Sequence, residues 1–209
     1  MRPSPLPVLL AAAALLLSPL AADAVERRVP EPHTTTIRIR LKGPTLRVRC
    51  RGGDCAVSVV GQGPSIAVSV TRTRPGEPPF TFARTLEGAR NIAIETGIGT
   101  DTVEVRDLAI PGFLRVATGV GDDALEVANV SAARKASIDS GDGDDAVRLT
   151  SVSFGGKVRF FAKAGDDDVT LTDGRFGSRV GLNGGQGIDG LVFEGDSFTE
   201  PPVVQSFER

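Results

Sequence analysis

A block of ten residues recurs five times in the C-terminal half of this chain, each copy starting 22 residues after the previous one. The copies are TGIGTDTVEV (96–105), TGVGDDALEV (118–127), SGDGDDAVRL (140–149), AKAGDDDVTL (162–171) and GGQGIDGLVF (184–193). They align without a gap and place one aspartate at the same position in every copy: Asp101, Asp123, Asp145, Asp167 and Asp189. A fixed period of this length is typical of solenoids, in which each repeat forms one coil and neighbouring coils share a continuous core.

The apolar residues follow the same period. Columns of like residues are Val103, Leu125, Val147, Val169, Leu191; Val105, Val127, Leu149, Leu171, Phe193; Ile94, Val116, Ile138, Phe160, Leu182; and Ile110, Ala132, Phe154, Phe176, Phe198. Apolar and polar residues alternate within the two main segments of each repeat, which indicates half-buried strands. No helical period separates them, and the Leu/Asn consensus of leucine-rich repeats is missing. The sequence therefore predicts an all-β, single-domain parallel β-helix or β-solenoid with 22 residues per regular coil.

The register continues towards the N-terminus in weaker form. The segment LRVRCRGGDCAVSV (46–59) overlays VRFFAKAGDDDVTL (158–171) and places Cys55 where the repeated aspartate would stand. Residues 65–86 alternate like strands but lack a Gly-Asp turn. With an opening strand at 34–41, we expect about seven coils: degenerate coils over 34–90, then regular coils and a C-terminal cap over 91–209.

The first 24 residues have the features of a secretory signal peptide: a basic start, an apolar run and a small-residue end. This predicts a mature chain that begins at Val25, with a Pro-containing lead-in over 25–33, and a secreted or periplasmic location. No later stretch is apolar for long enough to span a membrane. Export favours a disulfide between Cys50 and Cys55, the two cysteines of the chain.

Charge is unevenly distributed along the chain. Residues 27–90 carry 12 Lys/Arg against 4 Asp/Glu, whereas residues 91–209 carry 11 against 20. The acidic C-terminal portion points to cations rather than nucleic acid as partners. The basic N-terminal portion is interpreted first as ordinary solvated strand faces, the alternative being contact with an anionic glycan or lipid. An extracellular glycan or envelope component is the candidate macromolecular partner.

The repeated aspartates raise an electrostatic problem. Strands of neighbouring coils lie about 4.8 Å apart, so these carboxylates are expected to form a column at that spacing. Two adjacent charges repel by roughly 3.5 kcal/mol at an effective dielectric of ~20, or about 1 kcal/mol in water. Each aspartate has the parity of the inward-facing residue two positions later, so its carboxylate should point into the turn. Raised pKa values, backbone hydrogen bonds or bound cations can each relieve the repulsion.

The segment GGQGIDGLV (184–192) matches every specified position of the nonapeptide G-G-x-G-x-D-x-U-x. In this respect the chain resembles the RTX, or haemolysin-type, calcium-binding β-rolls. The resemblance implies calcium ions held between consecutive turns by the aspartates and by carbonyls of the loop glycines. Besides the five repeated aspartates, the implied site residues are Gly97, Gly99, Gly119, Gly121, Gly141, Gly143, Gly165, Gly185 and Gly187. Five loops enclose four gaps, which sets a ceiling of about four ions.

The chain departs from that family in three ways. It has one such turn per 22 residues, whereas tandem nonapeptides give coils of about 18 residues with ions on two sides. Lys163 replaces a loop glycine in the fourth copy. A leader peptide stands in place of the family's usual C-terminal export signal.

We expect a calcium-stabilised, non-enzymatic module with a structural, adhesive or binding role. Two alternatives remain open at this point: a metal-free solenoid whose Asp-Gly turns are purely structural, and a pectate-lyase-like enzyme acting on polysaccharides. The second rests on fold-level analogy. The single histidine, His33, lies in the lead-in and is not expected to be catalytic. A concave face with clustered charges would favour the enzyme, and a smooth face with small residues such as Ala93 and Ser137 would favour the module.

Overall fold

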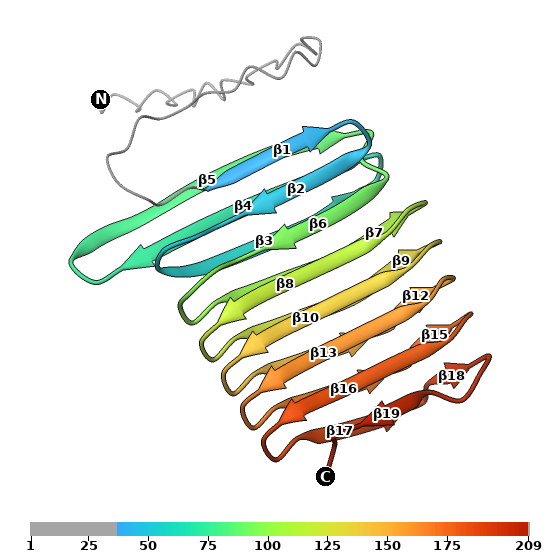
Figure 1. The fold of residues 1–209 in the computed structure, drawn as a ribbon. Helices are drawn as coiled ribbons and strands as arrows, with labels where there is room; N and C mark the ends of the chain where they lie inside the picture. Colours follow the sequence, from blue (N-terminus) through green and yellow to red (C-terminus); the bar gives the residue numbers. More distant parts are fainter. Residues whose placement is uncertain (1–36, 209) are drawn as a thin grey trace, which may run out of the picture.

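A computed structural model describes residues 37–208, and all regular structure in this range is β-strand. The expected signal peptide and lead-in lie outside the described residues. Two main sheets face each other across one core (Figure 1). Sheet A contains, in spatial order, β1 (Arg38–Lys42), β2 (Thr45–Arg49), β6 (Asn91–Glu95), β8 (Leu114–Val120), β10 (Ala136–Asp142), β13 (Val158–Ala164), β16 (Val180–Gln186) and β19 (Val203–Gln205).

Sheet B follows the spatial order β17 (Gly190–Glu194), β14 (Asp168–Thr172), β11 (Ala146–Thr150), β9 (Ala124–Ala132), β7 (Thr102–Ile110), β3 (Asp54–Gln62), β4 (Ser65–Arg74) and β5 (Glu77–Glu87). The short strands β12 (Ser153–Phe154), β15 (Arg175–Phe176) and β18 (Ser197–Phe198) extend it along one corner. No helix in this part of the chain is long and apolar enough to cross a membrane.

Successive coils stack in parallel at a constant offset of 22 residues, as Figure 1 shows for β8 to β16. In sheet A, Ile138 lies opposite Val116 on one side and Phe160 on the other. In sheet B, Val147 lies between Leu125 and Val169. This confirms the predicted parallel β-solenoid and its 22-residue period. Strands β2 and β3 form one further coil before the regular ones, and β19 begins another after them.

The core is formed by the inward residue of each alternating pair. Ile94, Ile138 and Leu149 are at most 1% exposed, and burying such a side chain stabilises the fold by about 1.5–3 kcal/mol. At the corner, the ring of Phe176 lies 6.2 Å from that of Phe154 and 4.8 Å from that of Phe198. The apolar columns predicted from the sequence are therefore the stacked rows of this core.

The N-terminal segment 34–90 differs in part from the expected degenerate coils. Only β2 and β3 take coil positions, because they pair in parallel with β6 and β7. Strands β1, β4 and β5 instead pair antiparallel with their neighbours and cover the N-terminal end of the stack (Figure 1). The hairpin β4–β5 is thus an insertion between the first coil and the second, and it accounts for the 46 residues between paired Val57 and Val103.

The physical reason for this difference is turn chemistry. Each of the three antiparallel connections is a two-residue loop made of glycine and proline: Gly43-Pro44, Pro64 with Gly63, and Pro75-Gly76. Such pairs reverse the chain direction between strands, with glycine supplying positive φ. These dipeptides are the sequence signal that distinguishes hairpins from coils here.

The C-terminal end is less completely covered. Val192, Phe193, Val203 and Val204 remain between 39% and 49% exposed. Phe193 belongs to a predicted core column, but it is the last member of that column and no further coil packs on it.

Candidate functional site

The five repeated aspartates line one edge of the solenoid, in the turns that lead from sheet A to sheet B. Each is at most 3% exposed, although aspartate is rarely fully buried without partners. Strand pairing places Ala124 beside Thr102 and beside Ala146, so the aspartates just before them stack in a single column. We call Asp101, Asp123, Asp145, Asp167 and Asp189 the inner ladder.

Each inner carboxylate accepts a hydrogen bond from the backbone of the coil before it. The N–H of Asp101 donates to Oδ1 of Asp123 at 2.7 Å, and the N–H of Asp123 donates to Oδ1 of Asp145 at 2.8 Å. The same bond runs from Asp145 to Asp167 at 2.9 Å and from Asp167 to Asp189 at 3.0 Å. The ladder thus supplies an acceptor for a buried N–H in every turn, where an unpaired donor costs about 1–3 kcal/mol.

Two different residues complete the ladder at its ends. The N–H of Cys55 donates to Oδ1 of Asp101 at 2.7 Å, so the cysteine occupies the rung where the aspartate is missing. At the other end, the N–H of Asp189 donates to a carboxylate oxygen of Glu208 at 2.9 Å. Glu208 was not predicted, because it lies 19 residues after Asp189 rather than on the repeat.

The second oxygen of each carboxylate is in a different position. Oδ2 of Asp123, Asp145, Asp167 and Asp189 is buried and has no hydrogen-bond partner. Room for these oxygens comes from small residues five positions earlier, which run Thr96, Thr118, Ser140, Ala162, Gly184 down the stack. A Cβ at Gly184 would overlap Oδ2 of Asp189. In four consecutive turns one buried carboxylate oxygen thus lacks a hydrogen bond of standard geometry, although the hydroxyls of Thr118 and Ser140 lie close enough to Asp123 and Asp145 to lower the pKa of each.

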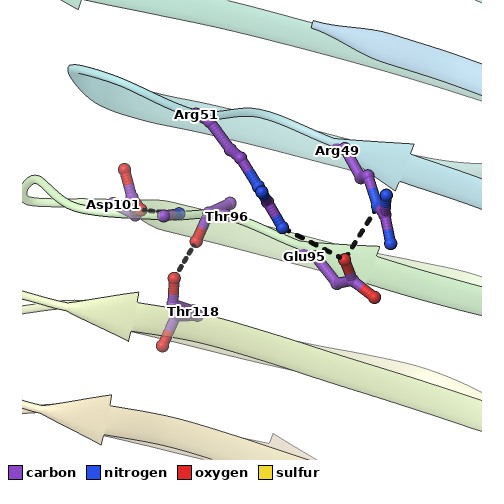
Figure 2. A network of polar contacts seen from close by, with 7 residues as sticks. Arg49, Arg51, Glu95, Thr96, Asp101 and Thr118 are labelled. Atoms are coloured by element: carbon purple, nitrogen blue, oxygen red, sulfur yellow. Dashed lines mark hydrogen bonds and ion pairs between the residues drawn. The ribbon is translucent and has the colours of Figure 1, made fainter. Parts of the chain in front are cut away.

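Polar contacts are fuller in the first of these turns, which Figure 2 shows. Oδ2 of Asp101 accepts a hydrogen bond from the N–H of Gly97 at 3.2 Å, and the hydroxyl of Thr96 donates to the carbonyl of Thr118 at 2.5 Å. Nearby, Glu95 forms ion pairs with Arg49 at 2.8 Å and Arg51 at 3.9 Å. Asp101 is thus the one inner rung whose two oxygens both have partners.

Burial controls the ionisation of the middle rungs. Desolvation raises the pKa of Asp123, Asp145 and Asp167 to about 6. Hydrogen bonds oppose that rise: the preceding backbone N–H does so in all three, and the hydroxyls of Thr118 and Ser140 do so at Asp123 and Asp145. The charges of neighbouring carboxylates add to the rise. At neutral pH these three carboxyl groups are therefore mostly ionised, and both their burial and their mutual repulsion destabilise the folded state.

A second, exposed ladder runs beside the first with the opposite polarity. Here the carboxylate of one coil accepts from the N–H of the coil after it: Asp122 from Asp144 at 3.1 Å, and Asp144 from Asp166 at 2.8 Å. Oδ1 of Asp166 accepts from Ile188 at 2.8 Å. These residues have the outward parity, for which the repeat pattern alone predicts mainly solvated turn positions. We call Asp122, Asp144 and Asp166 the outer ladder.

The outer ladder also acts on the inner one. The charge of Asp122 contributes to the raised pKa of Asp145, and that of Asp144 contributes to the raised pKa of Asp167. Each of these gaps between coils is therefore flanked by one inner and one outer carboxylate from different coils. The edge of the solenoid concentrates negative charge more strongly than the repeated aspartates alone would.

The glycines of the turns are required by backbone geometry. The second glycine of each loop has φ between 123° and 142°, for example in Gly121 and Gly143, a region that residues with a Cβ rarely adopt. The first glycine also packs against the coil before it, since a Cβ at Gly141 would overlap the carbonyl of Gly119. Lys163 occupies this first position with φ of 89°, and its ammonium pairs with Asp139 at 2.7 Å.

The two cysteines form the predicted disulfide. Cys50 and Cys55 are buried, their Cα atoms lie 6.2 Å apart, and the bridge connects β2 to β3 across the first turn. It therefore closes the one turn that has no inner aspartate.

The inner ladder fits a divalent cation in one respect and not in another. Its unpaired, buried Oδ2 atoms are the hard, charged oxygen donors that calcium prefers. However, Oδ1 and the main-chain carbonyl of each middle aspartate are already hydrogen-bonded, for example in Asp145. Across residues 37–208, no three acidic, histidine or cysteine side chains converge on one point. One carboxylate oxygen per turn, from Asp123 to Asp189, is thus available to an ion.

Two shallow hollows lie elsewhere on the described surface. One is lined by Asp107 of β7, Asn129 of β9 and Ser151 after β11, and another lies over β3, β4 and β5 beside Arg84.

Comparison of the chain with protein-family models, curated sequences and solved structures returned no match.

Proposed function

We propose that this protein is an exported, non-enzymatic β-solenoid that binds calcium along the inner ladder and acts outside the cytoplasm as a structural, adhesive or binding module. The observation that carries the proposal is the set of buried, unpaired Oδ2 atoms in four consecutive turns. Buried polar atoms are normally paired, so such a set requires a partner. In this proposal the turns work as those of the RTX β-rolls do.

Electrostatics favours a cation as that partner at neutral pH. Adjacent inner carboxylates repel one another, and the outer ladder adds further negative charge. An ion held between two coils would offset the charges of the two adjacent inner carboxylates and give each Oδ2 atom a partner. The residues that would hold the ion are Asp123, Asp145, Asp167 and Asp189. Because the unfolded chain has no such site, calcium binding would stabilise the folded state.

The role as a module is supported by what surrounds the ladder. The outer strand faces carry small residues such as Ala117 and Ser137 between charged ones. A disulfide closes the first turn, as is common in exported proteins. Ion binding in a calcium-rich exterior would lock the coils after export.

The deciding experiment compares calcium with chelator in the full-length protein and in Asp145→Asn. Asparagine keeps an acceptor for the N–H of Asp123 and removes the charge. We expect the melting temperature of the wild type to rise by about ten degrees or more in millimolar calcium, a shift that mass action allows for sites filled well above their Kd. Asp145→Asn should lose much of that rise, and Glu126→Gln, on the exposed face of β9, should keep it.

The opposite pattern would overturn the proposal. If millimolar calcium leaves the melting temperature of the wild type unchanged, or raises that of Asp145→Asn by as much as that of the wild type, the inner ladder is a metal-free hydrogen-bonding device. Isothermal titration in the same buffers reports the number of ions independently of stability.

A further inference from the structure

Three arginines form a regular line on the outer face of sheet A. Strand pairing places Arg47 opposite Ala93, Ala93 opposite Arg115, and Arg115 opposite Ser137. Ser137 in turn lies opposite Arg159. From β2 to β13 an arginine therefore stands on every second strand of one column, and because neighbouring strands are about 4.8 Å apart, Arg47, Arg115 and Arg159 recur at about 9.6 Å. Arg40 of β1 lies directly beside Arg47 and extends the column by one adjacent strand.

These arginines are exposed and available. All three side chains project to solvent from strands whose flanking residues are buried. None of them makes a hydrogen bond or ion pair through its side chain within residues 37–208. By contrast, Arg49 and Lys163 on the same face are paired with acids. The three arginines of the column thus lack a partner in the folded chain.

The residues between the arginines are small. Ala93, between Arg47 and Arg115, is only 8% exposed, whereas Ser137 is partly exposed and a Cβ at Gly181 would meet nothing within 4 Å. One neighbouring side chain adds an apolar surface: Phe161, two residues along β13 from Arg159, is 40% exposed on the same face. A ligand lying along the solenoid axis would meet the guanidinium groups of Arg115 and Arg159 and the ring of Phe161. The acids of the neighbouring column, Glu95 and Asp139, are paired with Arg49 and Lys163.

Sheet B does not share this arrangement. Its corresponding outward column runs Ser58, Glu104, Glu126, Arg148, Thr170, so it alternates neither in charge nor in size. The two faces of one solenoid therefore differ, which shows that the arginine column is not a general property of the repeat. Arg148 is the one arginine of this column, is exposed, and serves for comparison.

We propose that the outer face of sheet A, along Arg47, Arg115 and Arg159, binds an acidic polysaccharide. A linear polymer with carboxylates at regular intervals matches a one-dimensional row of guanidinium groups, which recognise carboxylates in bidentate fashion. A row one residue wide presents less cationic area to a membrane than a broad basic patch does, and a single exposed phenylalanine is a poor platform for stacked bases. The inference names the partner class of the module proposed above and does not depend on its calcium site.

The test measures binding of fluorescent oligosaccharides of polygalacturonate and hyaluronan to the full-length protein, with dextran as the neutral control. Because polygalacturonate itself binds calcium, each titration is run in chelator. The hyaluronan titration is then repeated in calcium. Circular dichroism reports whether the protein is folded under each condition. We expect Arg115→Gln to weaken binding about five-fold, which corresponds to roughly 1 kcal/mol. Arg148→Gln removes the same charge from the opposite face and should leave binding unchanged.

A second variant tests the column rather than the net charge. Ser137→Glu places a carboxylate between Arg115 and Arg159 on the solvent side of β10, and it should reduce affinity at least as much as Arg115→Gln. Equal effects of Arg115→Gln and Arg148→Gln would overturn the proposal. So would undetectable binding by folded protein, or tighter binding to phosphatidylserine vesicles or duplex DNA than to the acidic oligosaccharides. Failure here leaves the calcium-dependent melting shift untouched, so the two proposals fail separately.

Discussion

The backbone N–H of Asp145 donates a 2.9 Å hydrogen bond to the carboxylate of Asp167, the equivalent residue one coil later. Since Asp145 itself accepts the same bond from Asp123, each aspartate belongs to two rungs. A single substitution in the inner ladder therefore affects the turns on both sides of it.

Asp145→Ala should destabilise the protein by about 1–3 kcal/mol in chelator, because the N–H of Asp123 loses its buried acceptor. Chemical denaturation provides the measurement. The matched control is Asp144→Ala, which removes the neighbouring outer carboxylate from an exposed N–H of Asp166. It should change the free energy of unfolding by much less. Equal losses for the two variants would contradict the distinction between the ladders.

The inner ladder should also make stability depend on pH. In the folded state the pKa of Asp123, Asp145 and Asp167 is about 6, above the ordinary value of about 3.9 expected after unfolding. Between these values the folded state binds more protons, so stability should rise as pH falls from about 7 to about 4. Thermal melting in chelator across this range tests the sign. Asp145→Asn should reduce the slope, and a wild-type stability that falls over the whole range would contradict the prediction.

Lys163→Gly should stabilise the fourth regular coil. Lys163 has φ of 89° where three of the four equivalent residues are glycines with φ between 110° and 130°, and relief of such strain is worth roughly 1 kcal/mol. The loss of its exposed ion pair with Asp139 should offset only part of this gain. Denaturation midpoints measure the net effect. Gly141→Ala, which adds a Cβ against the carbonyl of Gly119, should destabilise instead.

Removal of the disulfide should weaken the first coil. The bridge closes a short loop between Cys50 and Cys55, for which the chain-entropy model gives about 2 kcal/mol. The double variant Cys50→Ser, Cys55→Ser should therefore melt below the wild type and show no further change on addition of reductant. A wild type that melts at the same temperature with and without reductant would count against this contribution.

Much of the architecture was predictable because the repeat is strict. Columns such as Ile94, Val116 and Ile138 fix both the strand positions and the parallel register, since neighbouring coils place equivalent residues side by side. The buried position of the inner ladder followed from the parity of Asp145 and Val147. These inferences rest on local alternation and a constant period, which a single sequence displays directly.

The remaining features depend on information that the period does not contain. The outer ladder involves residues of outward parity, whose bonds arise only when Asp144 and Asp166 come together across coils. Glu208 reaches Asp189 from the C-terminal segment, outside the repeat. The N-terminal hairpins were mistaken for coils because alternation alone is the same in parallel and antiparallel strands, and only dipeptides such as Pro75-Gly76 tell them apart.

The constant offset between coils also limits how this molecule can change in length. Loss or duplication of one whole repeat would rejoin equivalent residues such as Ile138 and Phe160 with every side chain still facing its proper side. An insertion of one residue into a strand would move the buried side chains of the rest of that strand to the solvent face, and the polar ones to the core. The chain can therefore gain or lose whole coils without loss of the core pattern, whereas insertion or deletion of part of a coil would disrupt it.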